Sequence, residues 1–181
     1  LAKSFVPDFW IINARLLDDN NELHPDRMPL VREIVENAAD RARVFNLSYG
    51  LEHCTGYLSV HAGELDELTR LHNCLFVVSA GNIELSALAA ALATRGTGKG
   101  YPGYLKDWRW RVRSPGEALN VLTVGGMAPD GSPHPPHPSR HAVAGPRAPS
   151  PFSCSGGLKN VVKPELVEVA GDLAYEAGGR G

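Results

Sequence analysis

The sequence predicts an α/β protein in which helices pack on the faces of a mostly parallel β-sheet. Two features of its 181 residues point to this fold class. Short apolar runs, each long enough for one buried strand, alternate with amphipathic stretches of helical period. Each apolar run ends in small or polar residues, which stop a strand. Strands joined through helices lie parallel in one sheet, because such connections are right-handed crossovers.

In the first half of the chain, three apolar runs predict strands and two amphipathic stretches predict helices. The strands are expected over residues 9–13, 43–48 and 74–80. The helices are expected over residues 27–41 and 64–72, where apolar side chains recur at three- and four-residue spacing. The resulting order, strand, helix, strand, helix, strand, is typical of a parallel sheet.

The second half of the chain is less regular. An Ala- and Leu-rich stretch over 85–94 predicts a short helix, and glycines between 96 and 103 predict a loop. A fourth strand is expected over 120–125, and residues 161–169 are expected to be extended. Residues 129–151 are rich in Pro, Gly, Ser and His, which predicts a mobile surface loop.

Composition and charge place residues 1–181 among ordinary globular proteins of one domain. Hydrophobic residues make up 43% and charged residues 21%. A net charge of −2 without a basic run predicts no nucleic-acid partner. No apolar run approaches the roughly 18–20 residues of a membrane span, so no membrane partner is expected. No leader of charged and then apolar residues opens the sequence at Leu1, so the expected compartment is the cytoplasm.

The cysteines do not form a pattern that carries chemistry. Cys54, Cys74 and Cys154 are odd in number, far apart and without a C-x-x-C pair. This spacing argues against a disulfide framework and against a thiolate zinc site. We expect reduced, partly buried thiols.

Two further motifs suggest a bound ligand, but neither meets the chemical requirements. His134, His137 and His141 have a spacing that could hold a metal, yet prolines separate them and no carboxylate lies between them. The glycine-rich stretch 96–100 lacks the Ser or Thr that a phosphate-binding loop needs directly after Lys99. We therefore expect no metal and no cofactor.

The most specific short string follows the strand expected over 74–80. Ser79, Ala80 and Gly81 are small residues, and Asn82 comes next, at the edge where open parallel sheets place their ligand sites. A carboxamide there offers N–H donors, which an acyl-transfer enzyme needs around a developing oxyanion. An asparagine also closes turns commonly, so this string alone leaves both interpretations open.

Six strings in sequence order resemble the subtilisin-like serine proteases, the subtilases. Each is weak alone, but their order and spacing together are specific, and the resemblance extends from about Phe9 to Gly171. The strings are Asn46-Leu47-Ser48-Tyr49-Gly50, Ala80-Gly81-Asn82, Tyr101-Pro102-Gly103, Thr123-Val124-Gly125, Phe152-Ser153-Cys154-Ser155-Gly156 and Lys163-Pro164-Glu165.

The resemblance implies a subtilisin-like three-layer fold, here incomplete, and a role for each matching residue. Asn82 would donate its side-chain N–H to the oxyanion. Two segments would form the walls of the S1 pocket, which takes the side chain before the scissile bond, and their backbones would pair with an extended peptide by strand addition. The first wall is Ser48, Tyr49 and Gly50, and the second is Ser79, Ala80 and Gly81. Tyr101, Pro102 and Gly103 would approach the bottom of the pocket. Tyr49 replaces the aliphatic residue usual in the family.

The strings that carry the catalytic triad of the family do not occur in this sequence. The family places its aspartate in Asp-Ser/Thr-Gly, its histidine in His-Gly-Thr and its serine in Gly-Thr-Ser-x-Ala. The resemblance therefore implies a partial catalytic domain cut from a longer serine endopeptidase, and predicts that this chain alone is inactive. The exposed edges of such a segment would favour a homo-oligomer.

Two alternatives stay open from the sequence. One is a catalytically inactive subtilase-like domain that binds peptides or proteins. The other is an unrelated α/β binding domain, which requires Asn82 to be buried away from any cleft.

Overall fold

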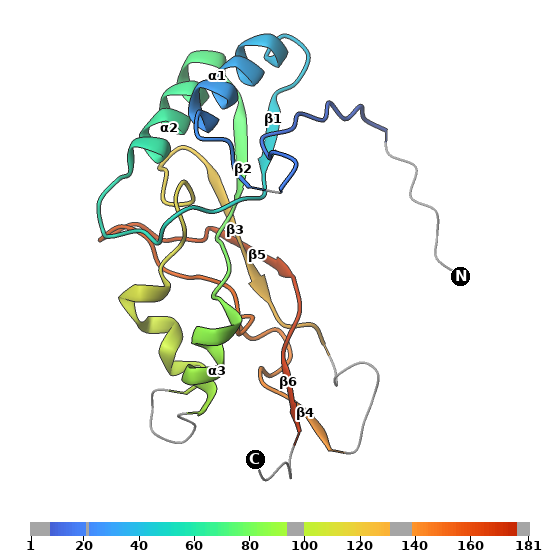
Figure 1. Cartoon of the computed structure of the whole chain (residues 1–181), viewed down its shortest axis with the longest axis vertical. Helices are drawn as coiled ribbons and strands as arrows, with labels where there is room; N and C mark the ends of the chain where they lie inside the picture. The colour runs from blue at the N-terminus through green and yellow to red at the C-terminus, as the bar shows by residue number, and fades with distance from the viewer. Residues whose placement is uncertain (1–7, 21, 94–99, 131–138, 177–181) are drawn as a thin grey trace.

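The computed structural model describes residues 8–20, 22–93, 100–130 and 139–176, and its centre is a four-stranded parallel sheet (Figure 1). The strand order is β1-β2-β3-β5. All three strand pairs are parallel, which confirms the predicted fold class. The strands are β1 Val44–Leu47, β2 Leu75–Ser79, β3 Leu122–Met127 and β5 Leu166–Val169.

Two helices, α1 Arg27–Ala38 and α2 Val60–His72, lie side by side on one face of this sheet (Figure 1). Their apolar side chains form the main core with inward-facing residues of β1 and β2. Arg32 of α1 is paired with Glu64 and Glu67 of α2. The buried members of this core are Val31, Val35, Leu47, Ala62, Leu65, Leu68, Cys74, Phe76, Val78, Ala118 and Val121.

Helix α2 begins four residues earlier than the apolar spacing predicts. Ser59 caps it, since the Ser59 hydroxyl accepts a 3.1 Å hydrogen bond from the N–H of Ala62. The helix ends at His72 and is capped by Asn73, which adopts the left-handed conformation with φ 48°.

Among the described residues, no helix covers the opposite face of the sheet. Side chains alternate between faces along a strand, so Val44, Val77 and Val124 point away from α1 and α2. Val44 is 61% exposed and Leu166 of β5 is 52% exposed. Parallel sheets are ordinarily covered on both faces. The described residues therefore form one helical layer and the sheet of the predicted three-layer fold.

The predicted strand over residues 9–13 is wrong for this structure. These residues pair with no strand among the described residues, and Trp10 is 99% exposed. A strand buried on both faces needs neighbours on either side, and the described chain supplies none at the outer edge of β1. The apolar run alone could not reveal this.

A second, smaller core lies beyond the carboxyl ends of the strands. It combines helix α3 Leu85–Ala93 with two short 3₁₀ helices, Gly103–Lys106 and Trp108–Trp110. Leu88, Tyr104, Leu105 and Cys154 are buried there, together with Ile83. Loop residues 96–99 lie outside the described residues.

The segment predicted as a mobile loop, 129–151, contains regular structure where it is described. Strand β4 Arg140–Ala142 pairs antiparallel with β6 Ala174–Glu176. Met127 and Pro149 form a further antiparallel bridge, and Ser150 is fully buried. The prediction is therefore wrong for 140–142 and 149–150, because pairing with distant segments overrides a loop-like composition. Residues 131–138 lie outside the described part.

Among the described residues, no helix is both long and apolar enough to cross a membrane.

Candidate active site

Residues 80–83 follow β2 and are held by hydrogen bonds from both sides. On one side, the N–H of Arg113 donates to the Ala80 carbonyl at 2.9 Å. On the other, the N–H of Cys154 donates to the Gly81 carbonyl at 3.0 Å, and that of Ile83 to the Phe152 carbonyl at 2.7 Å. Gly81 turns the chain here with φ +90°, a conformation that side-chain-bearing residues rarely adopt. The backbone of Asn82 is thus fixed at the carboxyl end of β2.

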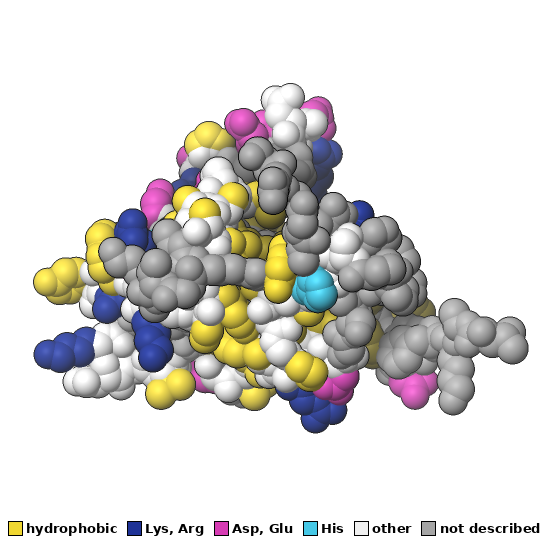
Figure 2. Space-filling view, turned by 90° about the horizontal axis from the view of Figure 1, so that it is seen from below, with side chains coloured by type: hydrophobic (Ala, Val, Ile, Leu, Met, Phe, Trp, Pro, Cys, Tyr) yellow, Lys and Arg dark blue, Asp and Glu magenta, His cyan; other side chains and the backbone are white. Residues whose placement is uncertain are grey.

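The side chain of Asn82 is exposed and lines an open cavity of about 320 Å³. The cavity lies on the uncovered face of the sheet, at the carboxyl ends of β1, β2 and β3, and small residues such as Gly126 and Ser153 also line it. Figure 2 views the molecule from the end that carries α3, β4 and β6, where apolar side chains gather in the middle of the surface. An exposed Asn82 excludes the alternative that required this residue to be buried away from any cleft.

The first predicted wall, residues 48–50, directs its side chains to different places. Ser48 lines the cavity and its hydroxyl accepts a 2.9 Å hydrogen bond from the Asn46 amide. Tyr49 packs against the core under α1 and α2 instead. Burial raises the pKa of the Tyr49 phenol. The tyrosine that replaces an aliphatic residue therefore contributes no side chain to the cavity, because residues 45, 47 and 49 alternate toward the core.

The second predicted wall, residues 79–81, has its backbone groups engaged within the chain. The N–H of Ala80 donates to the Val124 carbonyl at 2.9 Å, and the N–H of Gly81 donates to the Ser79 hydroxyl at 3.0 Å. Together with the bonds from Arg113 and Cys154, these bonds occupy both backbone groups of Ala80 and of Gly81. The N–H groups of Ala80 and Gly81 are therefore not free to donate to a peptide. Among the described residues, the backbone groups of Tyr49 and Gly50 have no backbone partner.

Arg113 lies between the two walls. A Cβ atom at Gly50 would stand 2.9 Å from the Cβ of Arg113, and one at Gly81 would stand 2.7 Å from its Cγ. Both glycines therefore provide the space that the arginine stem fills. Sequence reasoning missed Arg113. The glycine at the end of each wall was the available signal, but it does not identify the side chain that uses the space.

Tyr101, Pro102 and Gly103, predicted at the bottom of the S1 pocket, are not brought to it. The Tyr101 hydroxyl donates to the Pro149 carbonyl at 2.7 Å. The Tyr101 ring packs in the second core, beyond the ends of the strands. The segment that reaches the walls is 112–116 instead. The sequence contains two X-Pro pairs between the second wall and β3, Tyr101-Pro102 and Ser114-Pro115. The segment that contains the second pair is the one that lies beside the walls.

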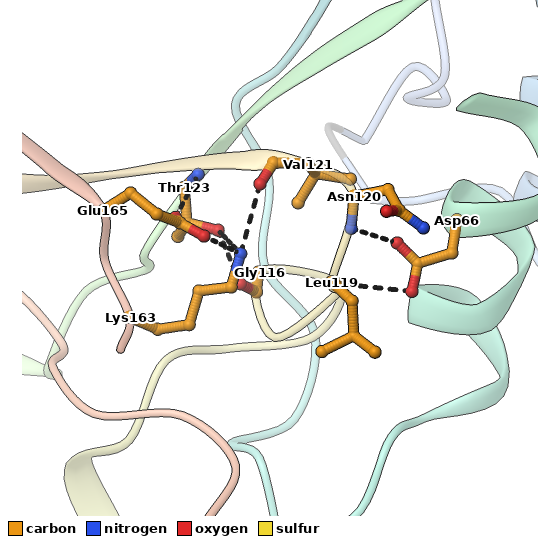
Figure 3. A network of polar contacts seen from close by, with 8 residues as sticks. All are labelled: Asp66, Gly116, Leu119, Asn120, Val121, Thr123, Lys163 and Glu165. Atoms are coloured by element: carbon orange, nitrogen blue, oxygen red, sulfur yellow. Dashed lines mark hydrogen bonds and ion pairs between the residues drawn. The ribbon is translucent and has the colours of Figure 1, made fainter. Parts of the chain in front are cut away.

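A buried polar network around Thr123 and Lys163 holds Gly116, the last residue of segment 113–116 (Figure 3). The N–H of Gly116 donates to the Arg113 carbonyl at 2.8 Å, and the Gly116 carbonyl accepts from the Thr123 hydroxyl at 2.6 Å. Lys163 donates to Thr123 Oγ1 at 3.1 Å and to the Val121 carbonyl at 3.2 Å, and its ammonium is paired with Glu165. All three ammonium hydrogens thus have an acceptor. The Lys-Pro-Glu string therefore anchors the start of β3 and the turn that carries Arg113.

Cys154 and His53 are close to this site but do not form an activated pair. The Cys154 sulfur lies 3.9 Å from His53 Nδ1. Burial raises the pKa of the Cys154 thiol to about 11, and the charge of Arg113 opposes this only in part. Because the thiolate is the nucleophile in cysteine enzymes, a thiol that stays protonated at neutral pH is not activated for attack.

Within the described ranges, no group of three or more metal-ligating side chains is present. His141 lies on β4, with its ring 5.5 Å from that of Tyr175. His134 and His137 lie outside the described residues.

Comparison with known proteins shows what this chain is similar to. The model of the subtilase family matches residues 7–179. An uncharacterized protein of Sinorhizobium fredii, y4bN, is 34% identical over 149 residues, which cover 80% of this chain and 32% of that protein. The chain therefore spans about a third of the length of this relative.

Proposed function

We propose that this chain, which belongs to the subtilase family, is the part of a serine endopeptidase that stabilises the oxyanion and forms the walls of the S1 pocket. In this proposal Asn82 donates its carboxamide N–H to the oxyanion that develops on the scissile carbonyl. The observation that carries it is the place of Asn82, fixed by its backbone but exposed in the cavity at the carboxyl ends of the parallel strands.

The substrate peptide is proposed to pair with the first wall only. Tyr49 and Gly50 have backbone groups without a backbone partner among the described residues, whereas those of Ala80 and Gly81 are engaged. An extended peptide can add as a strand beside residues 48–50 and place one side chain toward Gly50 and Gly81. The second wall then flanks that side chain without bonding to the peptide backbone.

The serine, histidine and aspartate are proposed to come from other parts of the full-length gene product. None of the three triad strings occurs in these 181 residues. The open face of the sheet and its exposed apolar residues, such as Val44 and Leu166, support further chain packing against it. In the whole protein, the serine would attack the carbonyl, the histidine would transfer the proton, and Asn82 would stabilise the resulting oxyanion.

The experiment that tests this proposal compares the full-length gene product with the 181-residue chain. Both are incubated with a fluorophosphonate probe, which labels activated serines, and with labelled casein. We expect labelling and cleavage by the full-length protein and neither by the chain alone. Labelling of a serine within the chain would contradict the assignment of the triad to other segments. A full-length protein that is folded but neither labelled nor active would favour an inactive domain that binds peptides.

A further inference from the structure

We propose that Arg113 determines the substrate specificity of the S1 pocket proposed between the two walls, so that the full-length protein cleaves after acidic residues. The inference rests on the proposed protease function, because it concerns the P1 side chain. This side chain precedes the scissile bond and would enter the proposed S1 pocket. It adds a residue that neither the family match nor the sequence motifs assign.

The stem of Arg113 occupies the space between the walls. Its Cβ, Cγ and Cδ are the atoms closest to the added Cβ positions at both Gly50 and Gly81. The side chain is 21% exposed, so part of it reaches the molecular surface. A large P1 side chain would have to displace this stem, which disfavours aromatic and long aliphatic residues.

The guanidinium of Arg113 is held in position by carbonyl groups from the two sides. Its Nε donates to the Asn82 carbonyl at 3.1 Å, and Nη1 donates to the Leu51 carbonyl, also at 3.1 Å. A guanidinium carries five N–H donors, so donors on the two terminal nitrogens remain even after a further side-chain hydrogen bond to the Cys154 thiol. The charge is thus fixed beside Asn82 and keeps donors for another acceptor.

Among the described residues, the one carboxylate paired with Arg113 is a weak and replaceable partner. Glu84 Oε1 lies 3.4 Å from Nη2, and the Glu84 side chain is 73% exposed. An exposed pair of this length contributes little stability. A glutamate or aspartate at P1 would bring a carboxylate to the same donors on a largely buried side chain, where charge-assisted hydrogen bonds are stronger. A lysine or arginine at P1 would meet a like charge instead.

The support of Arg113 is rigid enough to make the selection specific. The backbone N–H of Arg113 donates to the Ala80 carbonyl, and the Arg113 carbonyl accepts from the N–H of Gly116. Gly116 is in turn held by Thr123, which accepts a hydrogen bond from Lys163. A Cβ at Gly116 would lie 2.9 Å from the Arg113 carbonyl oxygen and 3.2 Å from the Ser79 carbonyl oxygen. The turn therefore packs closely against the second wall. A cation held in one position can distinguish a carboxylate from the corresponding amide.

The test measures kcat/KM of the full-length protein on fluorogenic peptides that differ only at P1, which is Glu, Gln, Ala or Lys. We expect Glu to exceed Gln by about tenfold or more, as for a partly desolvated charge pair, and Lys to be the poorest substrate. Glu and Gln have nearly the same shape, so their ratio isolates the charge.

Three variants separate selection from a structural role. Arg113→Gln should reduce the Glu-to-Gln ratio to about one, whereas Arg113→Lys should keep part of it. Glu84→Gln removes the competing carboxylate without disturbing the bonds to the carbonyls, so it should raise the ratio by roughly two- to fivefold. Arg109→Gln is the matched control, since Arg109 is exposed and paired with Asp107.

The outcomes distinguish this inference from the proposed function. Equal cleavage after Glu and Gln by the wild type, or a preference for Lys, overturns the role of Arg113 and leaves the protease function standing. An equal loss on all four peptides in Arg113→Gln, with an unchanged ratio in Glu84→Gln, also overturns it and marks Arg113 as structural. Absence of cleavage of every peptide and of fluorophosphonate labelling overturns the protease function and this inference with it.

Discussion

The guanidinium Nε of Arg113 donates a 3.1 Å hydrogen bond to the backbone carbonyl of Asn82, a residue 31 positions earlier in the chain. The bond joins the residue proposed to select the substrate to the residue proposed to stabilise the oxyanion. The two meet because segments 112–114 and 152–154 lie on opposite sides of residues 80–82 and bond to them. Substitutions that disturb this three-segment arrangement are expected to affect both roles together.

A side chain at Gly81 is expected to destabilise this arrangement. Gly81→Ala should lower the free energy of unfolding by about 1–3 kcal/mol, because φ is +90° and the new Cβ would stand 2.7 Å from Arg113 Cγ. Gly145→Ala is the matched control, since nothing lies within 4 Å of a Cβ at that position. Urea unfolding measures both variants. Equal stabilities of the two would show that Arg113 does not occupy the space beside Gly81.

Lys163 is expected to be essential for stability rather than for chemistry. Its side chain is fully buried and paired with Glu165. Lys163→Met leaves that carboxylate without its cationic partner and removes the bonds to Val121 and Thr123, so the free energy of unfolding should fall by about 3 kcal/mol. The control is Lys159→Met, at an exposed lysine, which should change it by less than about 0.5 kcal/mol.

Thermal and urea unfolding monitored by circular dichroism would measure this difference. If Lys163→Met unfolds at the same urea concentration as the Lys159→Met control, the network in Figure 3 does not anchor the turn.

The sequence predicts well those elements that depend on local pattern. Strands β1, β2 and β3 fall within two residues of their predicted bounds, because each is a short apolar run closed by small or polar residues. Helix α1 ends three residues early, at Ala38, and α2 starts early because Ser59 caps it.

The features that the sequence does not predict depend on contacts between distant segments. Residues 9–13 have the composition of a buried strand but lack a neighbouring strand in the described chain. The loop-like stretch 139–151 is ordered by β6 and by Met127. The place of Asn82, by contrast, could be predicted, because it lies only three residues after the end of β2. Arg113 could not, because its position depends on Gly50, Gly81 and the turn at Gly116 together.

Cys154 is expected to make stability fall at alkaline pH. Burial raises the pKa of its thiol to about 11 in the folded protein, from an ordinary value near 9. Below pH 9 the thiol is neutral in both states, so the full stabilisation is present. As pH rises from about 9 to 11, the unfolded chain releases this proton first, and the free energy of unfolding falls.

The measurement compares urea unfolding of the wild type and Cys154→Ala at pH 7 and pH 10. The loss of stability between these pH values should be smaller in the variant by roughly 1 kcal/mol. An identical loss in both proteins would contradict a raised pKa for Cys154. Rapid alkylation of native Cys154 at pH 8 would contradict it independently.

The most direct test of the central claim is the kinetic effect of Asn82→Ala in the full-length gene product. We expect kcat to fall by roughly 10²–10³ with little change in KM, the loss that removal of one oxyanion-hole donor causes in a subtilisin. Asn37→Ala, at an exposed asparagine of α1, is the matched control and should leave both constants unchanged. A loss confined to KM would show that Asn82 binds the substrate in its ground state, and an unchanged kcat would contradict its role in stabilising the oxyanion.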